Sequence, residues 1–470
     1  MNTLKNNEVN KIVLLAVTMT SNFFNPLMGA AVNIALPKIS NEFSLDAIAM
    51  SWITMSFLLA SAIFLVPFGK IADMMGRKKI FLYGNIFFML ATLLCAFSSS
   101  AYFLISSRLL QGIGSAMMFS TTMAIVISAF PVNERGKVIG MNVAAVYVGL
   151  SAAPIIGGFL TQSFGWRSLF FLNAGVSIFI ILATLVYIKA EWIEAKEEKF
   201  DWIGTLIYMP SIAAMMYGFS KLTTPMGILF TFSGITGLVA FVLVELKSKF
   251  PVLNMKLFFE NKIFANSNLS AFINYAATFA VSFVLSLYLQ YVKHLTPKEA
   301  GLILITQPLL MAIVAIFSGR LSDKINPRWL ASSGMLISVI GLFLLAFIEK
   351  ETSNVFIVVA LAILGFGFGL FSSPNTNMIM SSVERKFYGI ASATVSTMRS
   401  TGMMFSMAIA SLSIHLFVGE QKINDSNIES FIHSSKVIFI VFTVLCIIGA
   451  FSSLVGKKIK TNIIIVEENK

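Results

Sequence analysis

Residues 69–79 read GKIADMMGRKK and join two long uncharged apolar runs, residues 47–69 and 80–107. The stretch is short and charged, and Gly69 and Gly76 permit the close approach and tight turn of the backbone that a hairpin needs. A helix needs roughly 20 apolar residues to cross a bilayer. The stretch therefore predicts a tight hairpin between two membrane-spanning helices.

The rest of the 470-residue chain is equally apolar. It is 57% hydrophobic and 12% charged, whereas soluble domains carry about 25% charged residues. Only helices and closed barrels satisfy backbone polar groups in lipid, and the apolar runs lack the alternation of a strand. The sequence therefore predicts an all-α membrane protein with fourteen transmembrane helices. Their apolar runs are 12–37, 47–69, 80–107, 109–133, 138–166, 168–188, 202–220, 222–244, 263–292, 300–319, 329–348, 352–383, 400–419 and 437–456.

The distribution of basic residues predicts the orientation of these helices. The net charge of +12 could suggest a nucleic-acid partner. With the N-terminus inside, however, 24 of the 34 Lys and Arg residues fall in cytoplasmic segments and eight in outer segments, while Arg108 and Arg399 lie within spans. This excess follows the positive-inside rule. We therefore expect no nucleic-acid partner, and a multi-pass protein of the plasma membrane with both termini in the cytoplasm.

The predicted helices cluster as six, two and six. This grouping predicts a six-helix bundle at residues 1–188, a charged linker with two inserted helices at 189–262, and a second six-helix bundle with a tail at 263–470. The mixed charges of residues 189–199 suit a solvated or interfacial segment without a specific function. Residues 319–323, GRLSD, repeat the start of the first hairpin, which indicates that the two halves are related.

The hairpin pattern G-x-x-x-D-x-x-G-R-K-K resembles the signature loop of the major facilitator superfamily of secondary transporters. By that resemblance the loop is a conformational latch formed by Gly69, Asp73, Gly76, Arg77 and, in the next cytoplasmic hairpin, Arg135. Asp73 can accept hydrogen bonds from a helix N-terminus and pair with Arg77. The alternative is an ordinary basic inner loop. The superfamily has paired six-helix halves, with the transport site between them near mid-membrane.

A second motif lies in the fourth predicted helix. Residues 108–114, RLLQGIG, resemble the R-x-x-Q-G-x-G motif of the superfamily, and Arg108, Gln111 and Ser115 share one face of a helix. An arginine within a span costs about 2.5–3.5 kcal/mol on insertion scales and should face protein or water. We expect Arg108 in the substrate cavity; the alternative is a structural arginine satisfied by backbone carbonyls.

A third motif indicates the direction of transport. Residues 149–158, GLSAAPIIGG, resemble the G-x-x-x-G-P-x-x-G-G motif of antiporter branches through Gly149, Pro154, Gly157 and Gly158, although Ala153 stands where the family usually has Gly. Small residues let a partner helix pack closely, and proline loosens the local backbone. The resemblance implies an exporter rather than an importer.

Three further stretches narrow the branch. Residues 32–37 (VNIALP), 200–204 (FDWIG) and 396–402 (STMRSTG) resemble the fourteen-helix drug:proton antiporter branch, and the resemblance covers almost the whole chain. One departure concerns the coupling ion, because Met28 stands where that branch commonly has an aspartate. None of the 22 acidic residues falls well inside a predicted span, although Glu245 is near a helix end. Proton carriers are usually buried carboxylates or histidines, and the three histidines fall in outer loops or near a helix end.

The predicted cavity is therefore cationic. Arg399 lies about 16 Å from the cytoplasmic side at 1.5 Å per helical residue, close to mid-membrane. Two arginines without an acid favour neutral, zwitterionic or anionic amphiphiles as substrates. The expected cavity residues are Asn22, Asn25, Asn33, Arg108, Gln111, Ser115, Ser396 and Arg399.

The leading interpretation is an exporter of hydrophobic or amphiphilic small molecules that works by alternating access, with the proton coupling that the family implies. The alternative is a facilitator or importer of an organic anion on the same fold. A membrane-embedded enzyme would need clustered His, Asp, Glu or Cys residues at membrane depth, and the spans supply none. We expect no catalytic residue, metal or cofactor, core positions for Cys95 and Cys446, and a monomer.

Overall fold

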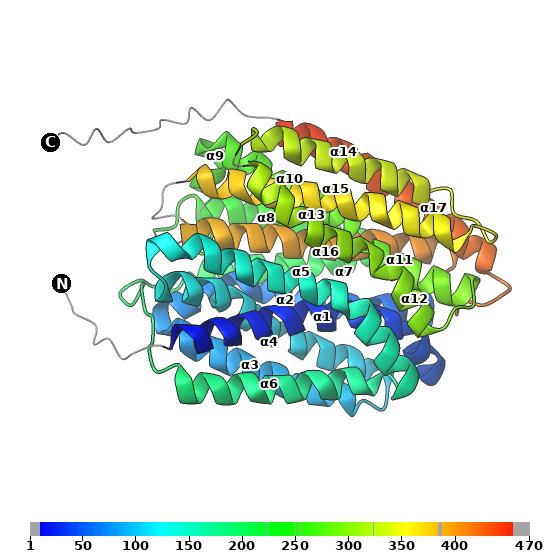
Figure 1. Ribbon diagram of the computed structural model, residues 1–470, viewed down its shortest axis with the longest axis horizontal. Coiled ribbons are helices and arrows are strands. Elements are labelled where there is room, and N and C mark those ends of the chain that lie inside the picture. Colours follow the sequence, from blue (N-terminus) through cyan, green and yellow to red (C-terminus); the bar gives the residue numbers. More distant parts are fainter. Residues whose placement is uncertain are drawn as a thin grey trace.

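The computed structural model describes residues 10–454 apart from 223, 250, 254, 323 and 384–387. In this part of the chain fourteen helical segments are long and apolar enough to cross a membrane (Figure 1). The predicted all-α fold and the predicted number of spans are confirmed. Asp323 of the repeated motif and both chain ends lie outside the described residues.

Six helices form the first bundle. They are α1 (Lys11–Phe43), α2 (Ala47–Met75), α3 (Arg77–Ala96), α4 (Ala101–Ala129), α5 (Val132–Ser163) and α6 (Arg167–Tyr187). A single residue, Gly76, separates α2 from α3, and its φ of 118° is one that side-chain-bearing residues rarely adopt. The predicted tight hairpin is therefore present.

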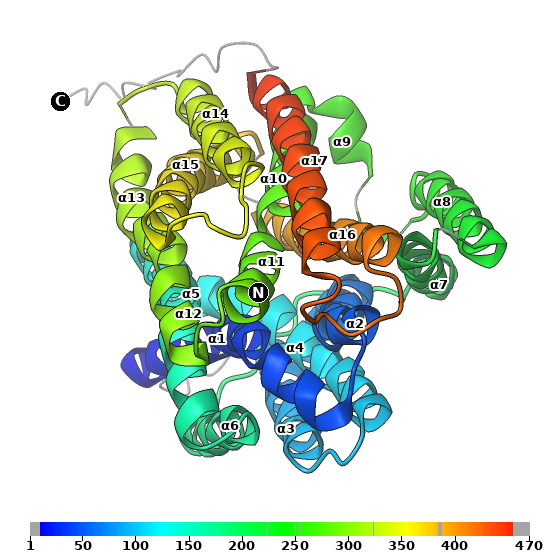
Figure 2. The ribbon, with the colours of Figure 1, turned by 90° about the vertical axis from the view of Figure 1, so that its right-hand side faces the viewer.

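The remaining helices form an inserted pair and the second bundle. The pair is α7 (Trp202–Ser220) and α8 (Pro225–Glu245), followed by the short α9 (Lys256–Glu260). The second bundle has six spans made by α10 (Lys262–Thr278), α11 (Val281–Leu287), η1 (Tyr288–Val292), α12 (Pro297–Leu304), α13 (Thr306–Ser322), α14 (Pro327–Leu345), α15 (Asn354–Ser381), α16 (Tyr388–Phe417) and α17 (Ile428–Leu454). Figure 2 shows α7 and α8 together at the edge of the molecule.

Two spans of the second bundle that the sequence predicts as continuous helices are interrupted. The first consists of α10, α11 and the π-helical η1, and the second consists of α12 and α13. At the first interruption the backbone N–H of Ala280 donates to Ser406 Oγ at 3.0 Å. The side chain from α16 thus satisfies a backbone donor at the break, as membrane burial requires.

We call the side on which α1 begins and α17 ends the terminal face, and the opposite side the far face. Several hydrogen bonds join described residues of the two bundles in the far half of the span or near its middle. They include Ser51 to Ser411 (2.8 Å), Ser286 Oγ to the carbonyl of Asn33 (2.9 Å), Gln290 Nε2 to the carbonyl of Ile34 (3.1 Å) and the Tyr147–Ser372 hydroxyl pair. The structure therefore joins the two bundles away from the terminal face.

The glycines of the third motif lie where α5 meets its neighbours. A Cβ on Gly149 would overlap the backbone oxygen of Phe23 in α1, and one on Gly157 would lie 3.0 Å from the Cβ of Ala31. A Cβ on Gly158 would lie 2.6 Å from the backbone oxygen of Pro297 in α12. Helix α5 therefore packs tightly against α1 in its own bundle and against α12 in the other.

The inserted pair contacts both bundles through α7. Tyr208 donates its hydroxyl hydrogen to the carbonyl of Ala62 in α2 at 3.1 Å. On the other side the rings of Phe219 and Phe405 in α16 lie 5.7 Å apart. Helix α8 contacts mainly α7 and leaves most of its surface exposed, as expected for a lipid-facing helix.

Candidate substrate site and conformational latch

A pocket of about 90 Å³ lies between the two bundles. This volume holds several water molecules or part of an organic ligand. Its walls come from α1 and α5 on one side and from α10, α11, α12, α13, α15 and α16 on the other. The lining residues are Ala30, Asn33, Ile34, Leu150, Pro154, Tyr275, Thr278, Phe279, Ser282, Leu304, Gln307, Pro308, Met311, Phe368 and Met403.

The polar groups of this pocket are neutral amides and hydroxyls. Asn33 is 1% exposed, and its Oδ1 accepts from Thr54 Oγ1 at 2.8 Å. Its Nδ2 has no hydrogen-bond partner. A buried donor left unpaired costs about 1–3 kcal/mol. A ligand carbonyl or ring nitrogen in the pocket, or a water molecule, would satisfy this donor.

Arg399 lies beside the pocket and does not line it. Its Nη2 donates to Thr376 Oγ1 at 2.7 Å, and its guanidinium carbon lies 5.7 Å from the ring centroid of Tyr275. Tyr275 lines the pocket and so stands between the cation and the cavity. The Nε of Arg399 has no hydrogen-bond partner. Ser396, one turn earlier on α16, is partly buried.

Arg108 lies elsewhere, enclosed among α2, α3 and α4 with no exposed surface. Its Nε donates to the carbonyl of Ile53 at 3.1 Å, and its Nη1 donates to Gln111 Oε1. The guanidinium stacks 4.4 Å from the ring centroid of Phe57. Backbone carbonyl, amide and ring groups thus surround Arg108, which is the environment that the alternative interpretation, a structural arginine, predicts.

The other predicted polar residues connect helices within the first bundle. Asn22 Nδ2 donates to Asn142 Oδ1 at 2.9 Å, which joins α1 to α5. Ser115 Oγ donates to Asn25 Oδ1 at 3.1 Å, which joins α4 to α1. Of the predicted cavity residues, only Asn33 lines the pocket.

The pocket also contains residues that the sequence analysis did not select. Tyr275, Thr278, Phe279 and Ser282 follow the spacing of one helical face, and all four line the pocket. Gln307 faces the pocket from the start of α13. The spacing of hydroxyl and aromatic residues over 275–282 was therefore the available signal.

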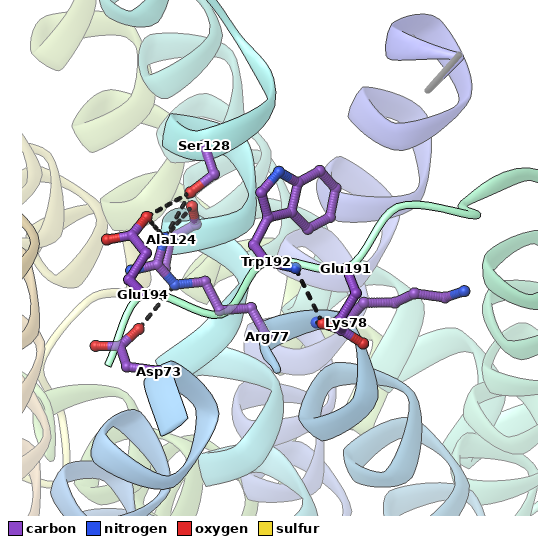
Figure 3. Close-up of polar contacts among 8 residues, drawn as sticks. All are labelled: Asp73, Arg77, Lys78, Ala124, Ser128, Glu191, Trp192 and Glu194. Carbon is purple, nitrogen blue, oxygen red and sulfur yellow. Dashed lines mark hydrogen bonds and ion pairs between the residues drawn. The ribbon is translucent and has the colours of Figure 1, made fainter. Parts of the chain in front are cut away.

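The predicted latch forms a network around Arg77 (Figure 3). Asp73 Oδ1 accepts from Arg77 Nε at 2.8 Å, as expected from the sequence. Arg77 Nη1 donates to Ser128 Oγ in α4 at 2.5 Å and to Glu194 Oε1 in the linker at 2.7 Å. Arg77 is only 7% exposed. Arg135 belongs to α5, but its side chain lies outside the described residues.

The glycines of the latch have different surroundings. A Cβ on Gly69 would have one neighbour within 4 Å, the Ser120 Cβ at 3.8 Å. A Cβ on Gly76 would lie 2.6 Å from the carboxyl carbon of Glu191. The backbone angle of Gly76 therefore favours glycine, and any added side chain would also have to displace the carboxyl group of Glu191.

Residues 189–199, which the sequence predicts as a solvated or interfacial segment without a specific function, contact the latch hairpin; we call them the strap. Glu191 lies beside Lys78 at the start of α3 (Figure 3). It accepts from the backbone N–H groups of Lys78 (2.8 Å) and Lys79 (3.2 Å) in the first turn of this helix. A carboxylate is favoured at a helix N-terminus. Glu198 forms an ion pair with Lys70 near the end of α2. The strap thus fastens both sides of the latch hairpin.

Few ionisable side chains of the described chain are buried. Arg77, Arg108 and Glu245 are the charged ones, and Cys95 and Cys446 are buried and free, as predicted. The prediction of His433 in an outer loop is wrong, because this residue lies within α17 against the ring of Phe417. Among described residues no group of three or more His, Cys, Asp or Glu side chains could hold a metal ion.

The sequence matches known proteins along almost its whole length. It is 28% identical over 443 residues to the riboflavin transporter RibZ of Clostridioides difficile (strain 630), covering 93% of this chain and 96% of that protein. It is 28% identical to the multidrug resistance protein Stp of Mycobacterium tuberculosis (strain CDC 1551 / Oshkosh), covering 85% and 75% of the two chains. It is 29% identical to the multidrug resistance protein 3 of Bacillus subtilis (strain 168), covering 80% and 74%.

A family model supports the same assignment and covers both bundles. The model of the Major Facilitator Superfamily matches residues 18–204 and 268–461. The unmatched residues between these ranges hold most of the inserted pair. With fourteen apolar helices, two bundles and a pocket between them, this chain belongs to the major facilitator superfamily, with relatives of the drug-efflux type.

Proposed function

We propose that this membrane transporter exports hydrophobic or amphiphilic small molecules by alternating access, with proton coupling. The supporting observation is that the pocket takes its walls from both bundles, so rocking of one bundle against the other would expose it to one side at a time. Export is supported by two relatives whose names describe multidrug resistance proteins. Transport rather than catalysis is the activity we assign.

The pocket chemistry supports neutral, zwitterionic or anionic substrates. Aromatic and methionine side chains offer an adaptable apolar wall, and the unpaired Nδ2 of Asn33 offers a hydrogen-bond donor. Arg399 adds a positive charge behind Tyr275, and no acidic residue lines the pocket. Riboflavin, named for one relative, is an uncharged planar molecule with several acceptors and suits this description.

We place the protein in the plasma membrane as a monomer with both termini in the cytoplasm, so that the terminal face is the cytoplasmic face. The excess of Lys and Arg on that side supports this orientation. Because the two bundles are joined toward the far face, the pocket between them would then receive its substrate from the cytoplasm. We divide the chain functionally at residues 188 and 262, with Gly69, Asp73, Gly76, Arg77 and Arg135 as the latch.

One observation favours a second candidate, a facilitator or importer of an organic anion. The pocket has a cation beside it and no acid in its lining, and a substrate with negative charge could itself balance the arginine. Such a carrier would need no proton. The two candidates therefore differ in their response to a pH gradient.

Flux into proteoliposomes separates these candidates. Three probes cover the charge classes: riboflavin (neutral), anilinonaphthalene sulfonate (anionic) and ethidium (cationic). Proton-coupled export predicts accumulation of riboflavin or the anion only when a pH gradient is imposed. Uptake that only reaches equilibrium and ignores the gradient would support the facilitator, and stronger transport of ethidium than of the anion would contradict the proposed substrate class.

A further inference from the structure

Glu245 is the one acidic side chain that is buried in the described part of the chain. It ends α8 at the terminal face and is 2% exposed. Its Oε2 accepts from the backbone N–H of Leu253 at 3.1 Å, whereas its Oε1 has no hydrogen-bond partner. A buried carboxylate oxygen without a partner is costly when ionised.

A second carboxylate faces this unpaired oxygen. Asp201 caps the N-terminus of α7, accepting from the backbone N–H of Gly204 at 2.8 Å through Oδ1. Glu245 Oε1 and Asp201 Oδ2 both lie within 3.1 Å of the position that a Cβ on Gly204 would take. The absent side chain of Gly204 thus gives the two carboxylates room to face each other. Thr205, the next residue, is also buried with an unpaired Oγ1.

The charged groups around this pair are few. Lys70 of α2 interacts electrostatically with Glu245 and is ion-paired with Glu198 of the strap. Lys247 and Lys249 follow Glu245 in the chain and are exposed to solvent. Asp201 Oδ2 accepts from Ser248 Oγ at 2.8 Å. Lys70 therefore interacts with Glu245 of the pair and is shared with Glu198 of the strap.

We propose that Asp201 and Glu245 form a proton-binding site, in which the pair carries one proton that is released when the site opens at the terminal face. The inference rests on the proposed function in one respect, because it makes this proton the coupling ion of transport. It places the site in the inserted helix pair, outside the central pocket.

The chemistry of the site favours a proton over a metal cation. Two carboxylates that lie against the same glycine repel each other when both are ionised, and one proton held by the pair removes this repulsion. Hard metal cations require six or more oxygen ligands in regular geometry. Here one oxygen of each carboxylate already accepts a backbone N–H, and Ser248 occupies Asp201 Oδ2.

The site has a physical connection to the latch. Release of the proton adds a negative charge near Lys70, which then has competing partners in Glu245 and Glu198. Lys70 lies on α2 one turn before Asp73. Proton release would therefore loosen the strap from the end of α2 that carries the latch.

Infrared spectroscopy of the purified full-length protein in lipid tests proton binding without any substrate. Across a pH series, the wild type should show a protonated-carboxyl C=O band that disappears as the pH rises. Glu245→Gln should lose this band, and Asp201→Asn should shift its midpoint. Glu197→Gln is the matched control, because Glu197 is exposed on the strap without an ion pair and should leave the band unchanged.

Transport of riboflavin in proteoliposomes tests the coupling. Glu245→Gln should lose accumulation driven by a pH gradient but keep riboflavin counterflow, which needs no gradient. An unchanged titrating band in both Glu245→Gln and Asp201→Asn would overturn the site, as would full gradient-driven accumulation in Glu245→Gln or accumulation driven by sodium instead. A wild type that moves none of the probes would refute the proposed function alone, because the infrared band is measured independently.

Discussion

The central pocket and the terminal face use opposite chemistry to hold their helices together. In the pocket the polar groups are amides and hydroxyls such as Asn33 and Gln307. At the terminal face Arg77 and Lys70 pair with Glu194 and Glu198 of the strap. A charge within a span costs about 2.5–3.5 kcal/mol, whereas water and counter-charges reach the face. Depth in the membrane therefore decides which interactions a helix contact can use.

The largest expected effect comes from the tight contact of α5 with α1. Gly149→Val should destabilise the protein by about 3 kcal/mol, because its side chain would enter the backbone of Phe23. Thermal unfolding of the purified protein measures the loss. Gly140→Ala on the same helix is the control, since no atom lies within 4 Å of the added Cβ. Equal melting temperatures for wild type and Gly149→Val would disprove the described contact.

Arg399 tests whether the neutral pocket depends on its neighbouring cation. Arg399→Gln should weaken binding of anilinonaphthalene sulfonate about ten-fold and riboflavin much less, because only the anion loses a charge interaction. Fluorescence titration measures both affinities. Thr376→Val removes the hydrogen-bond acceptor of Arg399 and keeps the charge, so anion binding should persist. Equal losses for both probes in Arg399→Gln would argue against an electrostatic role.

The latch should govern switching rather than binding. Asp73→Asn should slow turnover about five-fold with an unchanged Kd for riboflavin, because Arg77 loses one of its two charged partners while the pocket is untouched. Exchange kinetics and equilibrium binding separate the two quantities. Asp46→Asn at the other end of α2 preserves a good helix cap and should have no effect. Unchanged flux in Asp73→Asn would contradict the latch.

The smallest effect is expected at the exposed side of the strap. Glu194 is 61% exposed, so its ion pair with Arg77 is worth about 1 kcal/mol or less. Glu194→Gln should change turnover about two-fold at low salt and have no effect at 1 M salt, where charges are screened beyond roughly 3 Å. Glu197→Gln serves as the control. A large effect that persists in high salt would show that the strap contributes more than charge.

Hydropathy and turn residues were sufficient to predict the spans and the α2–α3 hairpin, because both depend on local sequence. Of the pocket, the sequence predicts Asn33, but the lining residues of the second bundle were not predictable in this way, since Asn33 and Gln307 come to line one pocket only when the two bundles pack. Arg108 shows a second reason. An arginine that lines a cavity and one that donates to a backbone carbonyl look the same in the sequence of a span, and only the surrounding side chains and backbone distinguish the two roles. The strap glutamates are predicted from composition as solvated or interfacial, because the local sequence does not distinguish a carboxylate that binds a helix N-terminus from one in water.

The position of α7 has a mechanical consequence. Its hydrogen bond from Tyr208 to α2 is directional, whereas its contact with α16 through Phe219 and Phe405 is a ring contact that tolerates sliding. The strap ties the preceding residues to the same bundle as α2. The inserted pair should therefore move as a rigid body with α1–α6 during each transport cycle, while α16 changes its position relative to α7.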